Sequence, residues 1–308
     1  MRRILLFCLV AGLPILALSL LLQRFGVAPV LTESISYDLK LAFAAEQNAP
    51  HYDILSVGSS ITLNNLHSQT LVEAFPAGVS YLNLASFNAN IQNSHEILEI
   101  VIPYYQPQLV LMMSNHVDFE SSKWRGLHSW LAERYLGHEL LPYFYIRRFN
   151  LYALLQRQRR TRRFMSEARA NMQQQMRMDA YGGVPLRVSP ENLNPNRQDT
   201  PPIAKLDSNQ YHALAELASW LKSQGIKLIY IQSPLKKSSC QSSECQSFQE
   251  RHIERCKQLI LAADQQFVDL YHGLTLADSV FCDELHLNFG GPKLATEALI
   301  KEIAISID

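Results

Sequence analysis

The feature that most constrains the fold of this chain is a repeated alternation of short apolar segments with longer segments of helical periodicity. Predicted strands cover residues 52–57, 79–84, 108–113, 226–232 and 267–270, and predicted helices cover residues 63–75, 91–104, 208–223, 244–265 and 292–305. Strands that alternate with helices build a mostly parallel sheet whose two faces are both covered. We therefore predict an α/β protein with three layers, formed by residues 51–308.

The amino-terminal residues have the pattern of a membrane anchor. An uncharged apolar run of 19 residues extends from Ile4 to Leu22, directly after Arg2 and Arg3, and about 20 such residues cross a hydrocarbon core. A cleaved signal peptide usually has a shorter apolar region and an Ala-x-Ala-like cleavage site. We expect residues 1–24 to be an uncleaved single-pass anchor. The basic pair favours a cytoplasmic amino terminus, although Arg24 weakens that signal, so the domain would face the outside of the cytoplasmic membrane.

Two segments interrupt or precede the α/β alternation. Residues 25–50 are predicted to be a linker with a short amphipathic piece, and residues 120–206 a helical insertion followed by an irregular loop. Lys+Arg and Asp+Glu balance at 28 each over the whole chain, but residues 147–187 hold ten Arg against two acids. Because an exported domain does not meet nucleic acid, we expect this basic segment either to lie near anionic lipid headgroups or to be a solvated helix face.

Four cysteines follow the predicted anchor: Cys240, Cys245, Cys256 and Cys282. An even number in an exported domain permits two disulfides with three possible pairings. Cys240 and Cys245 flank a four-residue loop and could close a small ring, although four free thiols remain an alternative. Zinc is disfavoured because no Cys-x-x-Cys pair occurs.

Polar residues gather at the positions where predicted strands end, which converge on one edge of a parallel sheet. Ser60 follows the first strand, and Asp283 and His286 precede the last helix. A serine hydroxyl becomes a nucleophile when a histidine takes its proton and a carboxylate orients that histidine. The backbone N–H groups of Ser60 and Ala85 and the Asn115 side chain could then stabilise an oxyanion. Taken singly, Ser60 and Asn115 are more typical of ordinary turns, and the pair of Asp283 and His286 is more typical of a surface pair or a helix cap.

Four sequence blocks carry a resemblance to a known superfamily. They are Ile54–Ser60, Asn83-Leu-Ala-Ser86, Met113-Ser-Asn115 and Asp283-Glu-Leu-His286-Leu-Asn288. These blocks resemble those of the SGNH (GDSL-like) hydrolases, which implies a flavodoxin-like α/β/α sandwich over residues 50–118 and 207–306. The resemblance implies Ser60 as the nucleophile, because serine is the third residue of the family's Gly-Asp-Ser pattern.

Three departures distinguish this chain from the family pattern. Ser59 replaces the family's Asp, Ala85 stands where the oxyanion glycine is expected, and His116 follows Asn115 where Asp is usual. The Gly-Ser-Ser form together with an anchor is similar to proteins that work beside membrane-bound O-acyltransferases in polysaccharide O-acetylation and in D-alanyl-lipoteichoic-acid synthesis. His116 and Asp118 are two potential metal ligands, which do not make a site, so we expect neither a metal nor a cofactor.

The predicted function is acyl transfer through Ser60, His286 and Asp283. The resemblance implies an esterase or O-acetyltransferase that acts on an acylated or acyl-accepting cell-envelope glycan. A membrane-bound O-acyltransferase is an implied partner, with the membrane itself bound through the first helix. The alternative is a catalytically degenerate scaffold that binds glycan or docks to such an acyltransferase, and the differences at Ala85 and His116 motivate it. A secreted lipase-like hydrolase is less favoured.

Overall fold

The fold is known from a computed structural model of the chain, which describes residues 2–24, 31–32, 34–47, 49–121, 136, 151–166, 175–193 and 203–303. Its centre is a five-stranded sheet in the order β2-β1-β3-β4-β5, with every neighbouring pair parallel. The strands are β1 (Ile54–Ser56), β2 (Tyr81–Asn83), β3 (Leu109–Ser114), β4 (Lys227–Gln232) and β5 (Gln266–Asp269). All five predicted strands are present, and the prediction of a mostly parallel α/β sheet is confirmed.

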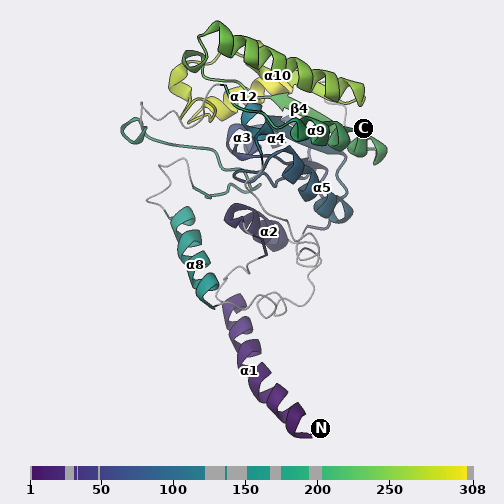
Figure 1. The fold of residues 1–308 in the computed structure, drawn as a ribbon, viewed down its shortest axis with the longest axis vertical. Coiled ribbons are helices and arrows are strands. Elements are labelled where there is room, and N and C mark those ends of the chain that lie inside the picture. Colours follow the sequence, from purple (N-terminus) through teal and green to yellow (C-terminus); the bar gives the residue numbers. More distant parts are fainter. Residues whose placement is uncertain are drawn as a thin grey trace.

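Helices cover both faces of this sheet (Figure 1). One face packs against α5 (Ile91–Tyr105), α9 (Ser208–Ser223) and α10 (Ser243–Ala262). The other face packs against α3 (Ser60–Asn65), α4 (Ser68–Ala74) and α12 (Gly291–Glu302). Successive residues of a strand point to opposite faces, so that Val110 and Met112 join the first core and Leu111 joins the second. Smaller elements are α11 (Leu270–Gly273) and the 3-10 turns His116–Phe119, Pro190–Asn192, Lys237–Ser239 and Asp278–Val280.

The predicted single helix at 63–75 is two helices in the structure. α3 ends at Asn65 and α4 begins at Ser68. The His67 side chain caps α4 by accepting from the Thr70 backbone N–H, and the His67 N–H donates to Thr296 Oγ1 at 2.9 Å. A tertiary contact to α12 and a local cap therefore override the helical periodicity of the sequence.

Residues 35–47, predicted as part of a linker, form the helix α2 (Ile35–Gln47) and pack into the core. Tyr37, Leu41 and Ala44 are buried there, which the linker prediction did not foresee. Asp38 of α2 binds Arg157 of α8 (Leu151–Met165), with 3.3 Å between the carboxylate and the guanidinium. α2 is thus part of the domain, and it holds the basic helix α8 in place.

The segment of the predicted anchor is helical: α1 (Arg2–Arg24) extends away from the domain (Figure 1). Within the residues that the structure describes, no helix is both long enough and apolar enough to cross a membrane. The anchor therefore stays a prediction. Residues 122–135, 137–150, 167–174 and 194–202 of the predicted insertion lie outside the described residues.

Residues 175–193, here called the crossing segment, run along the sheet edge that carries the predicted site. The backbone N–H of Asn83 donates to Tyr181 O at 2.8 Å, and Val184 N–H donates to Leu63 O at 3.0 Å. At the far end of the segment, Asn288 exchanges two hydrogen bonds with the backbone of Val188, at 2.8 and 2.7 Å. The crossing segment therefore touches the second sequence block and the last one.

Candidate active site

The nucleophile turn follows β1 and depends on Gly58. Its φ of +147° is a conformation that side chains rarely adopt, and a Cβ there would collide with Thr62. Thr62 fills that space and donates to Met113 O at 2.6 Å, which fastens α3 to β3. The Ser59 hydroxyl accepts from Ile61 N–H at 3.0 Å as the cap of α3. Ser60 is consequently the first residue of α3, at the carboxyl edge of the sheet.

The loop before α12 carries the other two residues of the predicted triad. His286 Nε2 lies 2.8 Å from Ser60 Oγ, and His286 Nδ1 lies 2.8 Å from Asp283 Oδ2. His286 Nδ1–H donates a hydrogen bond to the carboxylate of Asp283, so the lone pair of Nε2 faces the serine hydroxyl. The structure thus brings all three residues into one hydrogen-bonded chain.

Asp283 is buried yet ionised. Burial alone would raise the pKa of Asp283, but the charge and hydrogen bonds of His286 and the N–H of Leu285 lower it to about 2. The Leu285 and His286 backbone N–H groups donate to Asp283 Oδ1 at 2.8 and 2.7 Å. The carboxylate therefore both shapes the loop and holds the imidazole in one tautomer.

Asn65, which the sequence analysis did not single out, clamps the histidine loop to α3. Its Nδ2 donates to Leu285 O at 2.9 Å and its Oδ1 accepts from Leu287 N–H at 2.8 Å. The side chain is fully buried. An Asn in the same short helix as the candidate nucleophile thereby positions the loop that holds the candidate base, and only its place five residues after Ser60 could have suggested this.

The predicted oxyanion donors are not equivalent. Asn115 Nδ2 is buried and has no hydrogen-bond partner, while its Oδ1 accepts from Val117 N–H at 3.1 Å. The backbone N–H of Ser60 belongs to the first turn of α3, where such groups lack intrahelical partners. The Ala85 N–H, in contrast, donates to Asn83 Oδ1 at 3.0 Å. Of the three predicted donors, Asn115 Nδ2 has no hydrogen-bond partner and the Ala85 N–H is already engaged.

His116 and Asp118 lie in the short 3-10 turn that directly follows Asn115. His116 Nδ1 lies 3.1 Å from Gln249 Nε2 of α10, which fixes the turn after Asn115. Burial raises the pKa of Asp118 to about 6, against hydrogen bonds from Ser59 and Ser114. The Asp118 carboxylate therefore lies beside Ser59. In the SGNH pattern, an Asp stands at the position that Ser59 occupies here. Among the described residues, no group of three His, Cys, Asp or Glu side chains could hold a metal ion.

Lys40 of α2 is a fully buried amine close to the second block. Its Nζ donates to Asn83 O at 3.0 Å and to Gly182 O of the crossing segment. Burial lowers the pKa of Lys40 to about 7, with the charge of Asp179 opposing it. Nothing in the sequence pattern predicted this contact, because α2 was assigned to a linker.

One of the two disulfides that the cysteine count permits is present. Cys240 and Cys245 form a disulfide across the loop before α10, with 5.5 Å between their Cα atoms. Cys256 and Cys282 are free thiols. The small ring expected from the spacing is therefore present, and no second disulfide forms among the residues that the structure describes.

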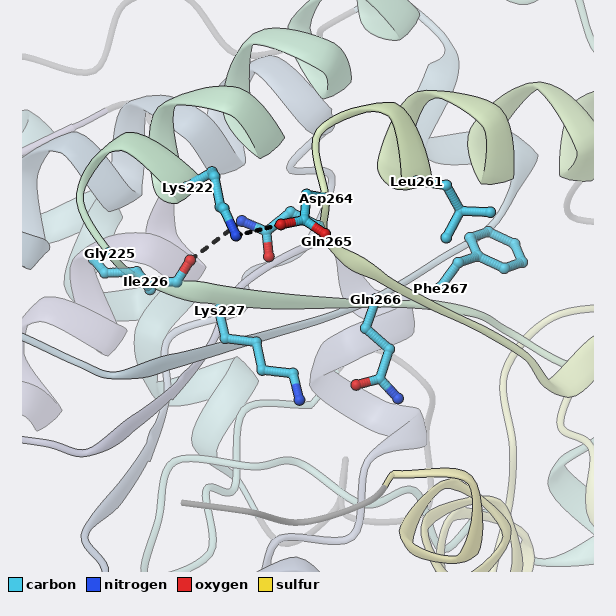
Figure 2. A pocket seen from close by; sticks show the side chains of 9 residues that line it. All are labelled: Lys222, Gly225, Ile226, Lys227, Leu261, Asp264, Gln265, Gln266 and Phe267. Atoms are coloured by element: carbon cyan, nitrogen blue, oxygen red, sulfur yellow. Dashed lines mark hydrogen bonds and ion pairs between the residues drawn. The ribbon is translucent and has the colours of Figure 1, made fainter. Parts of the chain in front are cut away.

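A hollow of about 630 Å³ lies away from these residues (Figure 2). It is lined by the first residues of β4 and β5, including Lys227 and Gln266, and by the ion pair of Lys222 with Asp264, 2.6 Å apart. Ligand sites of open α/β sheets lie at the carboxyl ends of strands. This hollow is at the opposite, amino-terminal edge and does not include the candidate site.

Comparison with known proteins gives distant structural similarities. No protein-family model matches the chain, and no curated protein matches it in sequence. A catalytic mutant of the acetylxylan esterase Axe2 from Geobacillus stearothermophilus is 12% identical, with a TM-score of 0.45 over 82% of this chain and 94% of that one. A lipase/acylhydrolase from Enterococcus faecalis is 12% identical, with a TM-score of 0.44 over 82% and 95%.

Proposed function

We propose that this protein transfers acyl groups through Ser60, as an ester hydrolase or O-acyltransferase. The observation that carries the proposal is the continuous chain from Ser60 Oγ through His286 to Asp283, with both contacts at 2.8 Å. The buried, unpartnered Nδ2 of Asn115 supports it, because such a group needs a hydrogen-bond acceptor. An ester substrate supplies one when its carbonyl oxygen becomes negative.

The reaction follows from these positions. His286 Nε2 takes the hydroxyl proton as Ser60 Oγ attacks the ester carbonyl, and Asp283 stabilises the imidazolium. The oxyanion accepts from Ser60 N–H and Asn115 Nδ2, and each such donor contributes about 3 kcal/mol to the transition state. His286 then protonates the departing alkoxide, which leaves an acyl-serine. A water or a sugar hydroxyl, deprotonated by His286, next attacks the acyl group and regenerates Ser60.

The finer proposal concerns substrate and place. We infer an O-acylated glycan of the cell envelope as the substrate, and a domain held outside the cytoplasmic membrane by α1. The exposed Leu13, Leu20 and Leu21 of α1 support an anchor, because apolar side chains avoid water. The Cys240–Cys245 disulfide supports an oxidising compartment. A membrane-bound O-acyltransferase remains the proposed partner.

The experiment that tests the activity uses the full chain in detergent and a fluorophosphonate probe, with the labelled serine mapped by mass spectrometry. We expect the label on Ser60, no label in Ser60→Ala or His286→Ala, and full labelling of Ser243→Ala, a matched control on the exposed start of α10. Circular dichroism establishes that each variant is folded. An unlabelled wild type that is folded would refute the proposal.

The second candidate is a degenerate scaffold that binds glycan without turnover. The observation that favours it is the engaged N–H of Ala85, which removes one oxyanion donor unless its bond to Asn83 breaks. The same labelling experiment separates the two functions, because a scaffold without a reactive Ser60 leaves the probe unbound.

A further inference from the structure

A second hollow, here called the flanking hollow, lies on the same sheet edge as Ser60. It has a volume of about 490 Å³ and is lined by the loop after β4, the first turns of α10, and α11 with the loop that follows. This volume is within the range of small-ligand sites. Because the loops after β4 and β5 leave the carboxyl ends of their strands, the flanking hollow and the nucleophile share one edge.

Hydrogen bonds join the flanking hollow to the histidine loop. Lys236, which lines the hollow, donates its backbone N–H to Glu284 O at 3.0 Å, and Glu284 directly follows Asp283. Ser233, three residues before Lys236, accepts from Asn65, the residue that clamps the histidine loop. The flanking hollow is therefore next to the loop that carries Asp283 and His286.

The lining offers the chemistry that binds a hydroxylated ring. Lys237 Nζ lies 3.2 Å from Thr275 Oγ1, and His272 lies between Asp269 and Glu250 with contacts of 2.6 and 2.7 Å. Ammonium and carboxylate groups that face solvent donate to and accept from hydroxyl groups.

An aromatic ring completes this lining. Tyr271 stands edge-on to His272, with 4.8 Å between the ring centroids. Its partly buried ring provides an apolar face, with a polar end, for the carbon side of a sugar. Purely apolar ligands would leave the charged side chains of the hollow unsolvated.

The rim of the flanking hollow is preformed. The Cys240–Cys245 disulfide closes the loop between β4 and α10, and Ser239 Oγ donates to Lys236 O at 2.6 Å. A loop that is already ordered loses less conformational freedom when a ligand binds. The rigidity of this loop favours a role for it in ligand binding over a role as a mobile lid.

We propose that the flanking hollow is a subsite for a sugar residue of the substrate glycan, at a distance from the acyl ester that reacts at Ser60. This inference rests on the proposed function, since it assumes that the ester belongs to a glycan. It adds that the enzyme requires an oligosaccharide for full affinity.

The test is glycan binding by the full chain with Ser60→Ala, which prevents turnover, on an array of hexasaccharides of glucose, N-acetylglucosamine, xylose and mannuronate. We expect at least one hexasaccharide to bind. Adding Tyr271→Ala or Lys237→Ala should weaken that binding at least tenfold, with circular dichroism as the measure of folding. Lys222→Ala, in the hollow of Figure 2, is the matched control and should bind as before.

Two results overturn the subsite: binding of none of these hexasaccharides, or equal binding by the parent and both flanking-hollow variants. Labelling of wild-type Ser60 by the fluorophosphonate probe tests the proposed function separately. Glycan binding without labelling would refute the proposed acyl-transfer activity and retain the sugar subsite. Labelling without glycan binding would refute the subsite and retain the activity.

Discussion

Replacing the buried Lys40 by Met should remove a specific pH dependence of stability. The Lys40 side chain is fully buried, and burial lowers its pKa from 10.5 to about 7. Between these two values the unfolded chain binds a proton that the folded protein does not. The free energy of unfolding therefore rises with pH across this window and falls as the pH drops toward 7.

The size of the effect follows from that gap. At 1.36 kcal/mol per pH unit, the full window from about 7 to 10.5 corresponds to roughly 5 kcal/mol. Between pH 7.5 and 9.5 the stability of wild type relative to Lys40→Met should increase by roughly 2–3 kcal/mol. Burial raises the pKa of buried tyrosines such as Tyr37, which lowers stability at high pH. This effect is the same in both proteins, so it cancels in the difference between them.

The assay is urea unfolding of the full chain in detergent, followed by tryptophan fluorescence at several pH values in this range. Lys222→Met is the matched control, because the Lys222 side chain is 54% exposed. Its curve should remain parallel to that of wild type. Parallel curves for Lys40→Met would show instead that Lys40 keeps its proton when folded, and the reasoning would fail.

Three further substitutions test the site. Asn115→Ala should lower kcat for p-nitrophenyl acetate about 100- to 1000-fold by removing an oxyanion donor, and a rate within threefold of wild type would exclude that role. Between pH 4 and pH 8 the free energy of unfolding of Asp118→Asn should rise by roughly 3 kcal/mol relative to that of wild type, because only wild type must ionise a buried carboxylate whose pKa is raised to about 6. Urea unfolding at both pH values measures this difference, and an unchanged difference would refute it. Asn65→Ala should cost about 2–4 kcal/mol of stability by leaving Leu285 O and Leu287 N unpaired, and an unchanged melting temperature would contradict it.

Sequence periodicity predicted the sheet well because buried parallel strands are continuous apolar runs bounded by turns. It placed Ser60, Asp283 and His286 correctly at one sheet edge, since strand ends converge there. The block around His286 was informative because its Asp, His and Asn all have contacts in the folded loop.

The parts that escaped prediction depend on contacts between distant segments. Lys40 looks like a surface residue of an amphipathic helix, and its burial is made tolerable by the carbonyl groups of Asn83 and Gly182. The N–H of Ala85 donates to the side chain of Asn83, two residues away, and sequence periodicity does not predict how that side chain is oriented. Likewise, the break between α3 and α4 depends on Thr296, far along the chain.

The sequence separation of 226 residues between Ser60 and His286, its proposed base, has a consequence for biogenesis. In a chain that emerges amino end first, the nucleophile appears long before the loop that can activate it. Closing so long an interval is slow and requires the sheet between the two residues to be complete. The proposed acyl-transfer chemistry would therefore be silent on the nascent chain and would begin only when the final loop docks against Asn65.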